Sequence, residues 1–407
     1  MNIRTVTKHN KDPFDNLEID KFKKWTSSQK SDYFLSIIAV SQIFLALGQF
    51  LLITFEMSPE ESTRYRVILS AVAIIASLPF LIKRNLKLLI ITYSIVGFVY
   101  AFHMLFLTDT VPYWNNEGLK FLVPISIPII LCMVSIKNIN YFCLAIKHIS
   151  YACAILGLLF GWCTFTGRFV LSEYSMGFGY CILLPMLVLF YQRKFYSIII
   201  SFLLFILLVV YGSRGPLLTV AIFLLYMLIK NKSYGLVGLM AILGVVGFTA
   251  FVSYIDSLGI SSRTVSMFLG GNIDAESNRD VIAQKAIELI KSNPITGYGL
   301  FGDRKPVGDW CHNIILEVFC DFGVILGSVL LLILFHSVFK AFIKLKGIYK
   351  DIFAMFIAYA FVPMFVSNSY LTDSNFALFV GLLLLIYKLR PWKRHNIYIK
   401  TASISAI

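Results

Sequence analysis

Two arginines of this mostly apolar chain have polar or turn-forming residues as neighbours. Arg214 lies in the turn GSRGPLL, between two apolar runs, and Arg279 opens a helical stretch after Ser277 and Asn278. Ser or Asn caps a helix, and the free N–H groups of its first turn favour an anion. A guanidinium binds phosphate through two parallel hydrogen bonds and stays charged. The pair therefore predicts a phosphate site, the alternatives being a snorkelling arginine at 214 and a solvated charge at 279.

The sequence DWCHNIILEVFCDFG places His312 beside Asn313, with Glu317 four residues after Asn313 on the same side of a helix. An imidazole can take a proton from a hydroxyl near neutral pH. We therefore interpret His312 as a candidate base, and Asn313 and Glu317 as candidates for substrate contact. Alternatively, Glu317, which lies deeper, orients His312 or hydrogen-bonds backbone. A structural histidine at the membrane interface is the alternative.

Two further candidates for substrate contact, Tyr298 and Arg304, belong to the preceding segment GYGLFGDR. Tyr298 could stack on a sugar ring or belong to an interfacial aromatic belt. Cys311 adjoins His312 but lacks the additional ligands that a metal site needs. Neither a metal nor a cofactor is expected.

Composition shows what must position these residues. The 407 residues are 58% hydrophobic and 14% charged, with a mean hydropathy of +0.78. A soluble domain is about one-quarter charged, so the composition indicates a membrane protein. The net charge of +14 lies in short clusters at the ends of apolar runs, which is the membrane-topology pattern and no sign of nucleic-acid binding.

Runs of membrane-spanning length recur along the chain. They predict an all-α polytopic protein with about twelve transmembrane helices: Tyr33–Phe55, Tyr65–Ile82, Leu86–Leu107, Leu119–Ser135, Tyr141–Phe165, Tyr174–Tyr191, Phe195–Gly212, Pro216–Ile229, Tyr234–Ile255, His312–Phe339, Asp351–Leu371 and Ser374–Leu389. Most of the 36 Lys and Arg residues fall in alternate loops if the N-terminus is inside. That rule places both termini in the cytoplasm.

The resulting organisation has five segments. They are a cytoplasmic tail (1–32), nine helices (33–255), one large external or periplasmic loop (256–311), three helices (312–390) and a cytoplasmic tail (391–407). Within the loop, apolar residues at helical spacing predict an amphipathic helix over Asn278–Ser292, stopped by Asn293-Pro294. Gly297, Gly299, Gly302 and Gly308 predict a turning segment before the next span.

Three pieces of the chain resemble the O-antigen polymerase and O-antigen ligase superfamily. They are GSRGPLL (212–218), NRDVIAQKAIELIKSNPITGYGLFGDR (278–304) and CHNIILEVFCDFGVILG (311–327). The resemblance implies a metal-independent glycosyltransferase of GT-C-like architecture in the bacterial inner membrane. It would use undecaprenyl-pyrophosphate-linked oligosaccharide at the outer face, with Arg214 and Arg279 binding the pyrophosphate and His312 activating the acceptor hydroxyl.

The compact form GYGLFGDR…CHNIILE, which spans the second and third pieces, looks more like O-antigen and capsule polymerases. That likeness implies a polymerase, with membrane lipid and a chain-length regulator as the other partners. An O-antigen ligase, which transfers glycan to lipid A core, is the second reading. A flippase for the lipid-linked unit is the non-enzyme alternative. It would predict ionisable groups spread along a path through the bilayer, whereas these cations cluster at one face.

Overall fold

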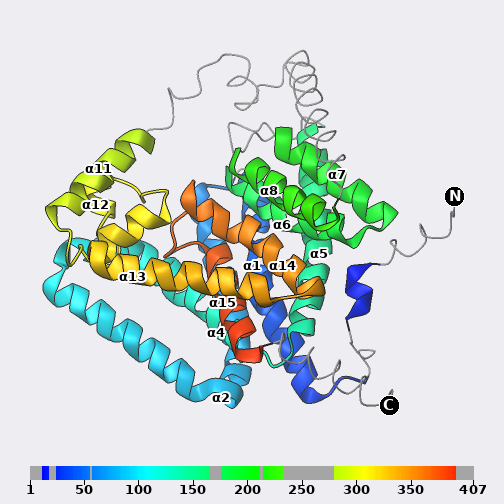
Figure 1. Ribbon diagram of the computed structural model, residues 1–407, viewed down its shortest axis with the longest axis horizontal. Helices are drawn as coiled ribbons and strands as arrows, with labels where there is room; N and C mark the ends of the chain where they lie inside the picture. The colour runs from blue at the N-terminus through cyan, green and yellow to red at the C-terminus, as the bar shows by residue number, and fades with distance from the viewer. Residues whose placement is uncertain are drawn as a thin grey trace, which may run out of the picture. The chain divides into compact units, whose positions relative to one another are not determined.

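The computed structural model describes residues 12–17, 24–55, 57–165, 176–210, 214–232 and 279–390. In this part of the chain every regular element is a helix, so the all-α prediction holds there (Figure 1). The longer elements are α1 (Ser27–Thr54), α2 (Pro59–Phe106), a π-helix (Trp114–Ser126), α4 (Ile127–Ser135), α5 (Ile139–Phe165), α6 (Met176–Gln192), α7 (Phe195–Val210), α8 (Arg214–Lys230), α11 (Arg279–Ser292), α13 (Ile314–Lys344), α14 (Gly347–Phe356) and α15 (Ser374–Leu389).

Among the described residues, six helical stretches are long and apolar enough to cross a membrane. They are Ser27–Ile53, Glu60–Phe106, Thr108–Ser135, Ile139–Cys163, Ile314–Lys344 and Gly347–Phe365, and shorter apolar helices include α6, α7, α8 and α15. Large apolar side chains such as Phe98 and Ile325 are more than half exposed on these helices, as lipid-facing residues are. Helix length and composition thus indicate an integral, multi-pass membrane protein.

Helix α2 bends sharply at Asn85, whose φ of −148° and ψ of 42° are not helical (Figure 1). The Asn85 amide donates to Ser135 Oγ at 2.7 Å. Arg84 binds the Asp32 carboxylate and donates to the Ser135 carbonyl at 3.0 Å. The stretch Glu60–Phe106 has 47 residues, about 70 Å of helix, which is more than twice the hydrocarbon thickness. Its two arms therefore correspond to the predicted spans Tyr65–Ile82 and Leu86–Leu107.

Where their residues are described, the remaining predicted spans fall largely on helices; Tyr234–Ile255 lies outside the described residues. Ser374–Leu389 matches α15 at both ends. Asp351–Leu371 ends early, because α14 continues as a π-helix and a 3-10 turn only to Phe365. The sidedness of the membrane and the five-segment division stay predictions.

The chain divides into two compact units. The first comprises Met1–Leu17, Ile43–Arg66 and Lys147–Asn278, and includes α6, α7 and α8. Within it, α6 packs on α7 and α8, and Phe160 stacks on Phe178 with ring centroids 4.4 Å apart. Buried Asp12 pairs with Lys147 at 2.8 Å and with Lys194 at 3.0 Å.

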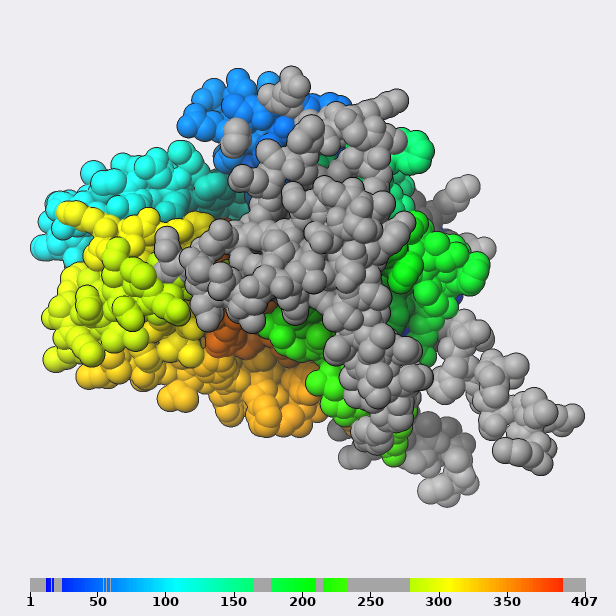
Figure 2. All heavy atoms as spheres, turned by 90° about the horizontal axis from the view of Figure 1, so that it is seen from above, coloured from blue at the N-terminus to red at the C-terminus, as the bar shows by residue number. Residues whose placement is uncertain are grey.

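The second unit comprises Glu18–Gln42, Val67–Ile146 and Arg279–Ile407. Within it, α15 packs along α4, and Gly381 makes room for Met133, which a Cβ there would approach to 2.8 Å. Helix α11 lies against α13. Figure 2 shows atoms from the end of α2 (cyan) beside those of α11, α12 (Arg304–Val307) and early α13 (yellow). This unit holds His312 and Arg279.

Helix α13 is broken at Gly323, where φ is 71° and ψ is 173°. The segment 294–299 lies against the break and supplies the missing hydrogen-bond partners. Tyr298 N–H donates to the Cys320 carbonyl at 2.8 Å, and Gly299 N–H donates to the Asp321 carbonyl at 2.9 Å. Val324 N–H in turn donates to the Pro294 carbonyl at 2.7 Å. The predicted turning segment thus satisfies the backbone of an interrupted membrane helix, as such interruptions require.

We expect Gly323→Ala to destabilise the fold. The backbone conformation at Gly323 is essentially restricted to glycine, and a Cβ would collide with the Ile295 carbonyl. Such strain costs about 1–3 kcal/mol before the collision is counted. The purified variant in detergent should unfold at a temperature several degrees below that of the wild-type protein. Gly97→Ala in α2 is the matched control, because the added methyl meets open space; an equal loss in the two variants would contradict the prediction.

Candidate functional site

His312 lies immediately before α13 and is held by a backbone carbonyl. Its Nδ1 is 2.7 Å from the Ser367 carbonyl oxygen. A carbonyl oxygen only accepts, so Nδ1 must carry the hydrogen, and in the neutral ring Nε2 keeps its lone pair. Trp310 Nε1 donates to the same oxygen at 2.9 Å. The structure therefore gives His312 the tautomer that a base acting through Nε2 requires.

The surroundings keep this ring fixed but accessible. Its backbone φ is +53°, an uncommon conformation for a residue with a side chain. The Trp310 ring meets the imidazole edge-on, with centroids 5.2 Å apart. Asp309 Oδ2 lies 3.8 Å from Nε2. The side chain is 16% exposed, so part of it is open to a ligand.

Asn313 is occupied as the N-cap of α13. Its side-chain oxygen accepts from Ile315 N–H at 2.9 Å and from Leu316 N–H at 3.4 Å. Its amide donates to the Phe365 carbonyl at 3.4 Å. This cap fixes where the helix begins and hence where the preceding histidine lies. The predicted contact of Asn313 with substrate stays a prediction.

Arg304 and Glu317 form a buried ion pair. Arg304 is 2% exposed and Glu317 is fully buried, and Arg304 Nη2 lies 3.0 Å from Glu317 Oε1. Arg304 also binds Asp303 through Nη1 at 2.6 Å and Glu117 through Nε at 3.2 Å. All three nitrogens of the guanidinium are thus engaged by carboxylates of the protein. This arrangement favours a structural role for Arg304 over direct contact with a phosphate.

Two of the carboxylates that bind Arg304, Asp303 and Glu117, lie outside the predicted membrane spans, and Asp303 is the more deeply buried of the two. Burial raises the pKa of its carboxyl, although the Arg304 guanidinium opposes the shift. Burial alone would lower the pKa of Arg304, but Asp303, Glu317 and Glu117 together raise it above its ordinary value. Asp303 also accepts from Cys311 N–H at 3.2 Å. The guanidinium is therefore charged, and it links the residues before His312 to the helices around them.

The segment between Phe365 and α15 contributes to the site, although the sequence pattern predicts most of it as the end of a membrane span. It carries Ser367, Ser369 and Tyr370, which lie against His312, Glu317 and Asp321. Ser369 Oγ hydrogen-bonds Glu317, Tyr370 N–H donates to Glu317 Oε2 at 3.1 Å, and Tyr370 OH donates to Asp321 Oδ2 at 2.6 Å. The polar run SNSYLTD within an apolar stretch was the signal that could have revealed it.

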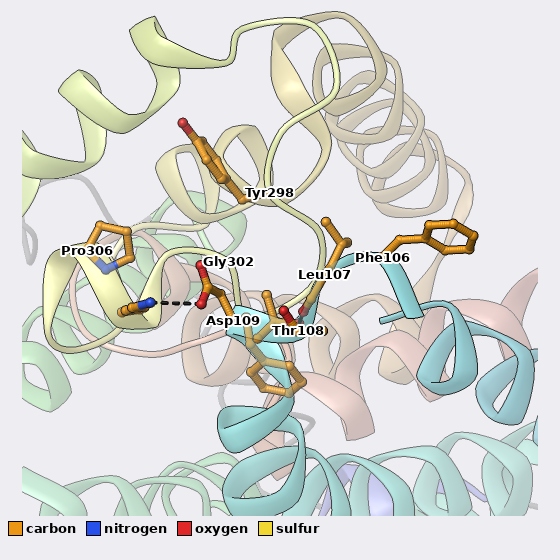
Figure 3. A pocket seen from close by; sticks show the side chains of 10 residues that line it. Phe106, Leu107, Thr108, Asp109, Tyr298, Gly302 and Pro306 are labelled. Carbon is orange, nitrogen blue, oxygen red and sulfur yellow. Dashed lines mark hydrogen bonds and ion pairs between the residues drawn. The ribbon is translucent and has the colours of Figure 1, made fainter. Parts of the chain in front are cut away.

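Tyr298 lines a cavity of about 230 Å³ between the end of α2 and the loop before α12. Figure 3 shows Tyr298 of the loop and Pro306 of α12 on one side, and Phe106 to Asp109, at and after the end of α2, on the other. At its rim Lys305 Nζ lies 2.8 Å from Asp109 Oδ1. The Tyr298 hydroxyl is 2.6 Å from Ser292 Oγ. Tyr298 and an exposed ion pair thus line one cavity, which is suited to a ligand with apolar faces and hydroxyl groups.

Arg279 is exposed at the first residue of α11. This helix packs on α13 and α12 through Ala286 and its neighbours Ile282, Leu289 and Ile290, so its apolar face covers protein. The predicted capping residues, Ser277 and Asn278, lie outside the described residues. Arg214 begins α8 in the first unit, and its side chain is likewise outside them. The predicted meeting of Arg214, Arg279 and His312 stays a prediction.

Within the described residues, no group of three or more His, Cys, Asp or Glu side chains is arranged to hold a metal ion. The long apolar helices define the class as an integral membrane protein of several spans. Residues 198–332 match the family model described as O-antigen ligase (Wzy_C), so the chain carries a domain of this family. The match contains all three motifs noted above, which confirms the resemblance. No protein with a curated description matches the chain.

Proposed function

We propose that this protein polymerises a surface polysaccharide, either O-antigen or capsule. It transfers the growing glycan from undecaprenyl pyrophosphate onto a new lipid-linked repeat unit, at the outer face of the bacterial inner membrane. The family match supports glycan transfer. The observation that carries the chemistry is the hydrogen bond from His312 Nδ1 to the Ser367 carbonyl, because it leaves Nε2 able to accept a proton.

In the proposed reaction the acceptor hydroxyl gives its proton to His312 Nε2 and attacks the anomeric carbon of the donor. The bond between that carbon and the pyrophosphate oxygen breaks as the glycosidic bond forms. Arg279, Arg214 and the N-terminus of α11 take up the charge on the leaving pyrophosphate. A GT-C-like arrangement, lipid contact and a separate chain-length regulator belong to the same proposal.

The cavity beside Tyr298 supports a role for that residue in holding a glycan. A sugar ring has apolar C–H faces that can pack on an aromatic ring, and hydroxyls that can reach Asp109 and Lys305 at the rim. The ion pair is exposed, so a ligand can compete for either charge at small cost. Asn313 and Glu317, by contrast, are occupied by protein groups, which supports roles in orientation for these two.

The function is tested with the purified protein and a lipid-pyrophosphate-linked repeat unit as the sole substrate. A ladder of longer lipid-linked glycans on a gel is the expected product, and EDTA should not abolish it. Transfer that begins only when lipid A core is added would identify a ligase instead. Movement of the lipid-linked unit across vesicles without any longer product would identify a flippase.

We expect Arg279→Ala to slow transfer by about 10²-fold, because one preorganised donor to a leaving group is lost. Arg279→Lys should recover part of the rate, since it keeps the charge but loses the two-pronged contact. Initial rates of ladder formation measure this. Lys285→Ala, an exposed base on the same helix, is the control. Equal rates in Arg279→Ala and wild-type protein would remove Arg279 from the pyrophosphate site.

A further inference from the structure

The Ser367 carbonyl determines the tautomer of His312. The contacts that fix the position of this carbonyl therefore also determine which imidazole nitrogen can act as the base. Ser367 belongs to the non-helical segment 366–373. On one side Ser367 N–H donates to the Pro363 carbonyl at 2.9 Å, where the preceding helix ends. From Ser369 onward, the segment contacts the buried carboxylates of Glu317 and Asp321. Its position therefore depends on contacts outside its own backbone.

Glu317 provides those contacts. Its Oε2 accepts from Tyr370 N–H at 3.1 Å, and its Oε1 accepts from the Ser369 hydroxyl. Glu317 lies in the first turn of α13, the helix that begins just after His312. His312 thus precedes this helix end directly, and Glu317 within the first turn binds the segment that orients the imidazole. A buried carboxylate with three protein donors has little freedom to move.

Arg304 completes the arrangement. Its Nη2 donates both to Glu317 Oε1 at 3.0 Å and to Ser369 Oγ at 2.9 Å. The guanidinium is planar and rigid, so these two contacts fix Ser369 relative to Glu317. Buried ion pairs add little net stability compared with apolar residues of the same volume, whereas they can specify one geometry. A positioning role explains why charges occupy this site.

We propose that the buried Arg304–Glu317 pair positions the base of the transfer reaction: by holding Ser369 and Tyr370 it fixes the Ser367 carbonyl, which keeps His312 in the Nδ1–H tautomer. The proposal rests on the proposed function only for its kinetic consequence. The tautomer itself can be measured without any substrate. Neither Arg304 nor Glu317 touches the glycan or the pyrophosphate in this arrangement; both act through His312.

The test uses full-length protein with ¹⁵N-labelled histidine, reconstituted in bilayers and observed by solid-state NMR. The chain has six histidines, and a His312→Asn sample assigns the His312 signals by difference. In wild-type protein the neutral ring should show a protonated Nδ1 and an unprotonated Nε2. Glu317→Gln and the milder Ser369→Ala should introduce a population protonated at Nε2.

In the same two variants kcat should fall by about 10- to 100-fold, the usual effect of a misplaced catalytic group. KM for the lipid-linked unit should stay within about twofold, because a change confined to the base leaves ground-state binding unchanged. Thr372→Ala removes a hydroxyl from the same segment, outside the hydrogen bonds of Glu317 and Arg304, and is the control. Its tautomer and kcat should equal those of wild type. Ser369→Ala keeps the test open if Glu317→Gln does not fold.

A wild-type tautomer together with wild-type kcat in both variants would overturn the proposal. So would an Nε2-protonated ring in the wild-type protein. Failure of the proposed function looks different: the wild-type protein would then form no ladder from the lipid-linked unit alone, while the NMR signals would still report whether the Arg304–Glu317 pair sets the tautomer.

Discussion

Replacing His312 with alanine is expected to lower the rate of glycan transfer by about 10²- to 10⁴-fold, the usual contribution of a positioned base. The ring is one of the better fixed groups of the site. Its Nδ1 binds the Ser367 carbonyl, and its edge meets Trp310. Alanine removes the proton acceptor, whereas the α13 cap on Asn313 lies one residue further on and is retained.

Single-turnover transfer of a labelled lipid-linked glycan measures this loss without interference from product release. His312→Gln is the informative second variant, since its amide can donate to the Ser367 carbonyl but supplies no basic nitrogen. Both should lose transfer to a similar extent, and His312→Gln, which can keep the hydrogen bond to the Ser367 carbonyl, should unfold near the wild-type temperature. His336→Ala, an exposed histidine further along α13, controls for the loss of an imidazole as such. Near-normal transfer by His312→Gln would show that the residue orients groups and takes no proton.

Local patterns predicted the elements of this fold well. The apolar run Ser374–Leu389 coincides with α15, because Asp373 caps it at one end and a charged tail follows at the other. The helix predicted over Asn278–Ser292 is α11, ended by Asn293-Pro294. The glycines after it do adopt left-handed conformations, at Gly297, Gly299 and Gly308. These features depend on residues close in sequence, so local sequence patterns are enough to predict them.

The cluster around Arg304 depends on contacts that no local pattern encodes. Its partners Glu117 and Ser369 lie 187 and 65 residues away along the chain. From sequence alone Arg304 belongs to a polar loop and reads as a substrate ligand, yet it is buried and paired. The same limit applies to Gly323: the glycine suggests a weak point in α13, but only the structure shows that segment 294–299 fills the break.

The second prediction with a large expected effect concerns stability. It distinguishes a structural role for Arg304 from direct contact with a substrate phosphate. Arg304→Ala should destabilise the protein by about 3–5 kcal/mol, because Asp303, Glu317 and Glu117 would be left together without their shared cation. Unfolding of the detergent-solubilised protein, followed by tryptophan fluorescence in denaturant, measures the loss. A direct phosphate ligand would instead lose activity and keep its stability. Lys305→Ala, which removes an exposed neighbour paired with Asp109, should unfold like wild type.

The loss in Arg304→Ala should also depend on pH, in a direction set by Asp303. Burial raises the pKa of this carboxyl above its ordinary value of 3.8, and Arg304 opposes the rise. Without Arg304 the folded-state pKa increases further, so the folded protein binds a proton that the unfolded chain releases. Stability then falls as pH rises from the ordinary carboxyl value through the raised one. The variant should therefore be closer to wild type in mild acid than at neutral pH, and Asp303→Asn in the same background should reduce that difference. A pH-independent loss would mean that the carboxylates find other partners, and that the guanidinium does not hold the cluster together.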